Sequence, residues 1–219
     1  GLWYAYLKGD TMSKTPIPAI NIRALKADDP ATINEGSLDH VDGKNQTLLF
    51  YAVRQKAPEV LAKIINSMDV NHQNAFGDTP LHIAASIGNI DALEKLLECG
   101  CDYTLKNKKG LTPLMEAARK GAAQSVETLL SKGVDLKETD KFDNTVLFYG
   151  VQSNAPAIVD TLIEHGADPY VLNQRRETLH QYAAQHASLS MVETLERHKV
   201  PLYLPSDYRE TPLHHAAKK

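Results

Sequence analysis

The sequence of 219 residues predicts an all-α repeat solenoid of stacked helix–turn–helix units joined by β-hairpin-like loops. Two observations support this fold class. Six threonines follow one another at intervals of 32, 33, 33, 33 and 33 residues, and each opens a related phrase such as TPLHIAA, TPLMEAA or TVLFYGV. A fixed period of this length is typical of solenoids, whose units bury their apolar faces against their neighbours. The threonines are Thr47, Thr79, Thr112, Thr145, Thr178 and Thr211.

The repeated phrase resembles the T-P-L-H-x-A core of ankyrin repeats, and the resemblance covers roughly residues 42–219. It implies about five full repeats and a truncated sixth. The sixth stops at Lys219 after its first helix, so we expect more protein to follow in the native chain. The repeats are expected to begin near residues 42, 74, 107, 140, 173 and 206.

Residues 1–41 lie outside the period and form an N-terminal extension or a degenerate capping segment. The stretch from Ile17 to Leu25 is compatible with a helix. An aromatic cluster that includes Trp3 and Tyr4 precedes it. Two interpretations stay open: the cluster packs as a cap on the first repeat, or it is the end of a preceding domain.

The second repeat shows how the sequence specifies each element. Gly77 suits a turn that needs a positive φ, and Thr79 is placed to cap the helix that follows. Pro80 fits the first helical position, where its missing N–H costs nothing. A second helix is predicted after Gly88, because apolar residues recur at helical spacing from Ile90 onward.

The fifth repeat is expected to be the least regular. Asn45, Asp143 and Arg176 replace the hairpin glycine in the first, fourth and fifth repeats. Asparagine and aspartate tolerate a left-handed backbone, whereas arginine does so poorly. The fifth repeat also has His180 where the other repeats have leucine.

The sequence offers little support for catalysis. We find no nucleophile elbow, phosphate-binding glycine loop or zinc-protease motif. The two cysteines, Cys99 and Cys101, are too few for a zinc site. By the resemblance, His82 and His214 are structural residues that hydrogen-bond hairpin backbone. We therefore expect no enzyme activity, catalytic residue, metal or cofactor in this segment.

Candidate binding residues lie at the hairpin tips and on the exposed side of the first helices, which carry most partner contacts in the ankyrin family. Three positions before each threonine, cations and aromatic residues alternate along the chain. We also expect exposed apolar residues and a local basic patch in the third repeat. The candidates are Lys44, Phe76, Asp78, Ile87, Lys108, Lys109, Leu111, Arg119, Lys120, Phe142, Asn144, Arg175, His186 and Tyr208.

These observations favour a non-enzymatic protein-interaction module that binds a protein or extended peptide, with acidic and apolar side chains, on its concave face. An alternative is the targeting arm of a larger enzyme or of a bacterial effector that acts in a host cell. A third hypothesis, nucleic-acid contact through residues 106–120, is the weakest because the net charge is -3. No apolar stretch is long enough to span a membrane, and a cytoplasmic or nuclear location is expected.

Overall fold

The computed structural model describes residues 17–202, and in this part of the chain every regular element is a helix. The chain divides into two compact units. The first comprises residues 1–84 and 91–102, and the second comprises residues 85–90 and 103–219. The expected aromatic cluster at the N-terminus and the sixth repeat, including His214, lie outside the described residues.

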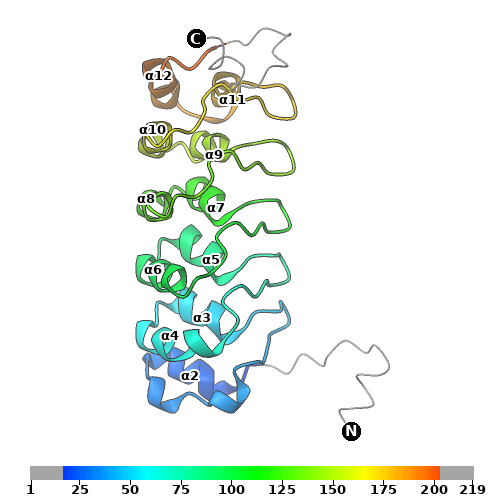
Figure 1. Cartoon of the computed structure of the whole chain (residues 1–219), viewed down its shortest axis with the longest axis vertical. Coiled ribbons are helices and arrows are strands. Elements are labelled where there is room, and N and C mark those ends of the chain that lie inside the picture. Colours follow the sequence, from blue (N-terminus) through cyan, green and yellow to red (C-terminus); the bar gives the residue numbers. More distant parts are fainter. Residues whose placement is uncertain (1–16, 203–219) are drawn as a thin grey trace, which may run out of the picture. The chain divides into compact units, whose positions relative to one another are not determined.

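The first compact unit contains the N-terminal helix, the first repeat and most of the second repeat (Figure 1). Its helix α2 (Ala19–Ala27) confirms the helix expected near Ile17–Leu25 and packs against α3. The remaining elements are η1 (Pro30–Thr32), η2 (Glu35–Ser37), α3 (Leu48–Gln55), α4 (Pro58–Ile64), η3 (Ile65–Ser67) and the larger parts of α5 (Pro80–Ile87) and α6 (Ile90–Glu98).

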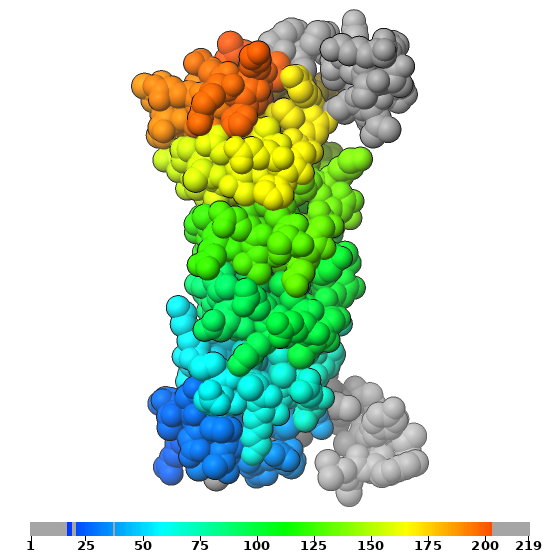
Figure 2. All heavy atoms as spheres, turned by 60° about the vertical axis from the view of Figure 1, so that its left-hand side comes forward, coloured from blue at the N-terminus to red at the C-terminus, as the bar shows by residue number. Residues whose placement is uncertain are grey.

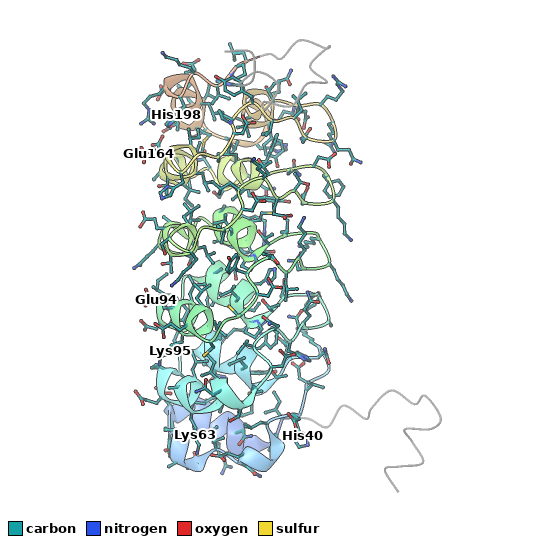
Figure 3. The ribbon with its side chains drawn as sticks, viewed as in Figure 1. His40, Lys63, Glu94, Lys95, Glu164 and His198 are labelled. Carbon is teal, nitrogen blue, oxygen red and sulfur yellow. The ribbon has the colours of Figure 1, made fainter. Side chains whose placement is uncertain are left out.

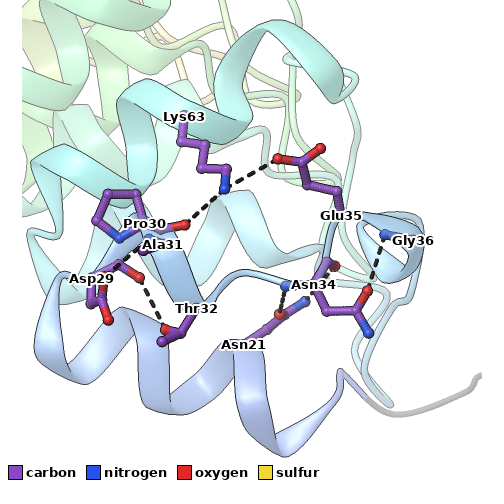
Figure 4. Close-up of polar contacts among 9 residues, drawn as sticks. All are labelled: Asn21, Asp29, Pro30, Ala31, Thr32, Asn34, Glu35, Gly36 and Lys63. Carbon is purple, nitrogen blue, oxygen red and sulfur yellow. Dashed lines mark hydrogen bonds and ion pairs between the residues drawn. The ribbon is translucent and has the colours of Figure 1, made fainter.

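Polar side chains fasten the segment after α2 to the first repeat (Figure 4). The side-chain oxygen of Asn21 accepts the backbone N–H of Asn34 at 2.8 Å. Lys63, on α4, donates to the carbonyl of Pro30 at 2.8 Å and pairs with Glu35 at 3.1 Å. Asp28 accepts backbone N–H groups at the start of α4. The segment preceding the first repeat is therefore built onto that repeat.

The second compact unit contains α7 (Pro113–Arg119), α8 (Ala123–Leu130), α9 (Val146–Gln152), α10 (Pro156–Glu164), α11 (Leu179–His186) and α12 (Leu189–Arg197). The first helices α7, α9 and α11 contact one another in sequence, and so do the second helices α8, α10 and α12. Hairpin loops project beside the first helices (Figure 1). Figure 2 brings the second helices forward, in green, yellow and orange.

Small residues let the paired helices of a repeat approach closely. Gly150, on α9, is buried, and a Cβ atom at this position would lie 3.1 Å from a methyl carbon of Val159 on α10. Leu147 on α9 and Leu162 on α10, each three residues from this contact along its helix, are fully buried. Any side chain at position 150 would therefore displace a core residue.

The repeat threonines do not all cap their helices. Capping is confirmed at Thr79, Thr112 and Thr178, whose hydroxyls accept the N–H of His82, Met115 and Gln181. In the first and fourth repeats, the backbone N–H three residues after the threonine instead donates to the threonine carbonyl, as Phe148 does to Thr145. The buried hydroxyls of Thr47 and Thr145 consequently have no hydrogen-bond partner among residues 17–202.

The hairpins adopt the backbone conformation that the glycine pattern predicts. Gly77 and Gly110 have φ values of 78° and 84°. Their replacements Asn45, Asp143 and Arg176 have φ values of 57°, 60° and 61°. The fifth repeat thus keeps the common hairpin conformation even with arginine at the left-handed position, although this conformation is unfavourable for arginine.

Candidate functional site at the hairpin tips

Each hairpin within residues 17–202 is held from inside by an aspartate or asparagine at its first position. In the fourth hairpin, residues 140–144, one carboxylate oxygen of Asp140 accepts the backbone N–H of Phe142 at 2.8 Å and that of Asn144 at 2.9 Å. This local bonding bends the chain into a loop. The same pair of bonds forms at Asp42, Asn74, Asn107 and Asn173.

The residue at each hairpin tip is exposed. Phe142 exposes 61% of its surface and Phe76 exposes 57%, which are large fractions for phenylalanine. Lys44, Lys109 and Arg175 are exposed as well. The expected exposure of these side chains is confirmed, whereas Tyr208 lies outside the described residues.

Neighbouring hairpins of one compact unit are joined through their backbones. In the second unit, the N–H of Gln174 donates to the carbonyl of Phe142 at 2.8 Å. In the first unit, the N–H of Ala75 donates to the carbonyl of Lys44, also at 2.8 Å. These bonds use backbone N–H and carbonyl groups at the tips, so mainly side chains are left to contact a partner.

The hairpins of the first and fourth repeats are completed by a tyrosine on the following helix. Tyr51 donates its hydroxyl to Asp42 at 2.9 Å, and Tyr149 donates to Asp140. Asn144 adds an amide bond to the same carboxylate at 3.1 Å. Burial raises the pKa of Tyr149, and its bond to Asp140 raises it further. Tyr149 therefore remains a hydrogen-bond donor at neutral pH.

The third hairpin is completed by a glutamate instead. Asn107 donates its side-chain amide to Glu116 at 3.2 Å, and Arg119 pairs with the other carboxylate oxygen at 2.6 Å. Glu116 is only 6% exposed. Lys106 is likewise paired, with Glu138 at 2.6 Å. The basic patch expected in this repeat is thus partly neutralised, and Arg119 is not a free cation.

The fourth and fifth hairpins and helix α11 line an open pocket with a volume of about 470 Å³ in the second compact unit. It brings together four of the candidate residues: Phe142, Asn144, Arg175 and His186. Four further lining residues escaped the sequence analysis, namely Asn173, Gln174, Glu177 and Tyr182.

Aromatic rings form one wall of this pocket. The ring of Tyr182 lies 5.3 Å from that of the buried Phe148 in an edge-on arrangement, and 4.4 Å from that of His186 in a tilted one. Burial raises the pKa of Tyr182, and the carboxylates of Glu177 and Asp140 add to this effect. The rings of Tyr182 and His186 lie side by side along this wall.

Polar bonds arrange the carboxylate of the pocket. Glu177 accepts the side-chain amide of Asn173 at 2.8 Å and that of Gln185 at 3.1 Å. The bond from Asn173 is the main reason why the pKa of Glu177 is lowered, with further contributions from Gln185, Arg175 and His186. Glu177 is therefore charged at neutral pH.

The other candidates have different surroundings. Leu111 is 2% exposed, so its expected place on the exposed surface is wrong: it lies at the base of the third hairpin, where its N–H is bonded to Asn107. Ile87 is 42% exposed, as expected. Lys108 and Lys120 are exposed, whereas Asp78 is half-buried.

His82, Cys101 and His180 are buried in the core of their repeats. The Nδ1 atom of His82 lies 2.8 Å from the hydroxyl of Thr79 and accepts the N–H of the same residue at 3.1 Å. Burial raises the pKa of the Cys101 thiol to about 12. His180 is 3% exposed, and burial lowers its pKa while the Pro201 carbonyl opposes that shift. No cluster of three metal-ligating side chains occurs among residues 17–202.

A comparison with models of protein families identifies the family of these repeats. The family model described as ankyrin repeats (3 copies) matches residues 27–107, 49–140, 88–173 and 147–219. In the part of the chain that the structure describes, no helix is long and apolar enough to cross a membrane. The repeated hairpins, the paired helices and this match agree, and the chain belongs to the ankyrin-repeat family.

Proposed function

We propose that this protein is a non-enzymatic interaction module that binds a partner protein or extended peptide on the face formed by its hairpins and first helices. Ankyrin repeats are in general protein–protein interaction modules. The observation that carries the choice of face is the pocket in the second compact unit, which gathers Phe142, Asn144, Arg175 and His186 from two hairpins and one helix.

The chemistry of this face supports the proposal. Aromatic residues and arginine are enriched where proteins meet, and exposed apolar groups bordered by polar ones often mark contact sites. Phe142 and Arg175 provide such a pair at adjacent tips. The hairpins hold these tips through partly buried hydrogen bonds, so little ordering is needed when a partner binds.

The test compares partner capture by the whole chain and by two triple variants. The hairpin variant carries Phe76→Ala, Lys109→Ala and Phe142→Ala, all at exposed tips. The control variant carries Glu94→Ala, Lys132→Ala and Glu164→Ala. Glu94 and Glu164 project from the second helices, away from the hairpins of their own units (Figure 3).

We expect the hairpin variant to lose the proteins that the unmodified chain captures from a lysate, quantified by mass spectrometry, and the control variant to keep them. Both variants should retain the helical circular dichroism of the parent, because all six side chains are exposed. Undiminished capture by a folded hairpin variant would exclude this face as the binding site.

A further inference from the structure

We propose that the pocket between the hairpins 140–144 and 173–177 receives an acidic side chain and an adjoining apolar side chain from an extended segment of a partner protein. The inference rests on the proposed function, since it assigns a partner chemistry to the same face. The inference follows from a contrast among the charged groups of the pocket: the carboxylates are hydrogen-bonded within the described part of the chain, whereas the arginine is not.

The acidic groups around the pocket already have donors. Asp140 accepts the N–H groups of Phe142 and Asn144, the side-chain amide of Asn144 and the hydroxyl of Tyr149. Each oxygen of Glu177 accepts one side-chain amide. These bonds compensate both carboxylates internally, so a cationic ligand has little to gain from them.

Among the described residues, the cation of the pocket is compensated only by its charge interaction with Glu177. Arg175 is exposed at the tip of the fifth hairpin, and within residues 17–202 its guanidinium forms no hydrogen bond or ion pair. Arg119 of the third repeat shows the contrast, because its guanidinium is bonded twice to Glu116. The unused donors of Arg175 match the planar, bidentate geometry of a carboxylate.

Apolar surface lies next to this cation. Phe142 exposes 61% of its surface at the adjacent tip, and the paired rings of Tyr182 and His186 lie on the helix behind it. An apolar side chain placed here would remove ring surface from water. The volume of about 470 Å³ is within the range of roughly 300–1,000 Å³ that is common for ligand pockets.

The matched probes are synthetic Gly/Ser peptides that differ only in a central pair, which is Phe-Glu, Phe-Gln or Phe-Lys. Each peptide is titrated into the whole chain labelled with ¹⁵N, and the dissociation constant is read from amide chemical shifts. We expect the Phe-Glu peptide to bind about tenfold more tightly than the Phe-Gln peptide, because a carboxylate forms an ion pair and can accept two bonds from the guanidinium, whereas an amide offers one uncharged oxygen. The Phe-Lys peptide should bind most weakly.

Two variants with the same change of charge locate the effect. Arg175→Gln should weaken binding of the Phe-Glu peptide about tenfold and leave the Phe-Gln peptide unaffected. Lys132→Gln, an exposed residue just after α8 and outside this pocket, should change neither affinity. The shifted amides should belong to residues 142–144, 174–177 and 182–186.

Equal affinities for the glutamate and glutamine peptides, preference for lysine, shifts outside the pocket, or no binding by any peptide would each overturn the inference. The result is separable from the proposed function. If the hairpin variant loses its captured partners while the peptides show no preference for glutamate, only the assigned chemistry fails.

Discussion

The third and fourth repeats build nearly the same hairpin with differently placed charges. In the third repeat, the hairpin begins with neutral Asn107, and the acid is Glu116 on the following helix. In the fourth repeat, the acid is Asp140 in the hairpin itself, and the helix supplies the neutral donor Tyr149. Both loops bend around two backbone N–H bonds to the first residue.

The difference shows how one backbone frame supports different surfaces. The helix glutamate of the third repeat binds Arg119 and withdraws it from potential partners. The fourth repeat has no cation to withdraw at this position, where the residue is Gln152, and its tip presents Phe142. Both acids are thus used inside their repeats, but the third repeat also pairs its arginine, whereas the fourth presents an exposed aromatic ring.

The largest predicted effect comes from removing the hairpin acid of the fourth repeat. Asp140→Ala leaves four donors without their acceptor, so we expect unfolding to become easier by about 3 kcal/mol. Asn107→Ala should cost about 1 kcal/mol less, because the bonds that it removes, two from backbone N–H groups and one to Glu116, involve a neutral amide and not a carboxylate. Urea denaturation followed by circular dichroism measures both.

The control for this pair is Asp143→Asn, which keeps a residue tolerant of the left-handed conformation at an exposed position. We expect it to change stability by less than about 0.5 kcal/mol. An equal cost of Asp140→Ala and Asn107→Ala would contradict the view that the charge of Asp140 strengthens the bonds of its hairpin.

His180 extends the comparison to the fifth repeat. The third and fourth repeats place the buried residues Leu114 and Leu147 at the same position. Burial lowers the pKa of His180 below its ordinary value of 6.5. The unfolded chain therefore gains a proton on this histidine more readily than the native chain as the pH falls below 6.5. Protonation of His180 consequently leaves the stability of the native state unchanged above this pH and lowers it below this pH.

We expect His180→Leu to stabilise the protein by about 1–2 kcal/mol at pH 7, because it removes a buried polar ring whose nitrogens lack well-aligned hydrogen bonds in the described residues. It should also reduce the loss of stability between pH 7 and pH 5, measured by urea denaturation at each pH. His165→Leu, at an exposed position, serves as the control. An unchanged pH dependence in His180→Leu would refute this account of the fifth repeat.

The smallest effect concerns the threonines that open the repeats. Thr112→Val removes a helix cap and should cost about 1 kcal/mol. Thr145→Val removes a buried hydroxyl that has no partner among residues 17–202, so it should be neutral or slightly stabilising. Thermal unfolding of the two variants measures the difference, and equal losses would show that Thr145 also acts as a cap.

Much of the fold can be predicted from the sequence because its signals are local and repeated. The period sets the helix pairs, and the positive φ required at one hairpin position explains the choice of Gly77, Asn45 and Asp143. The exposure of Phe76 and Phe142 follows from their place at the tips. The family match agrees with this interpretation.

The site is harder to predict because burial and pairing depend on contacts between elements. Leu111 occupies a position that is polar in the neighbouring repeats, as in Asp78 and Asn144, but its own side chain is buried. The pairing of Glu116 with Arg119 had a visible signal, because residues three apart share one side of a helix. The lining residue Tyr182 had no comparable signal, since its role depends on α11 and the two hairpins lining the same pocket.

The most direct test of the proposed binding face is hydrogen–deuterium exchange of the whole chain, measured alone and with a captured partner. We predict that the partner slows exchange in the hairpins 140–144 and 173–177 and in the adjoining turns of α9 and α11. Exchange in α8, α10 and α12 should remain unchanged. Protection confined to these second helices, with hairpins that exchange as fast as in the free protein, would contradict the account.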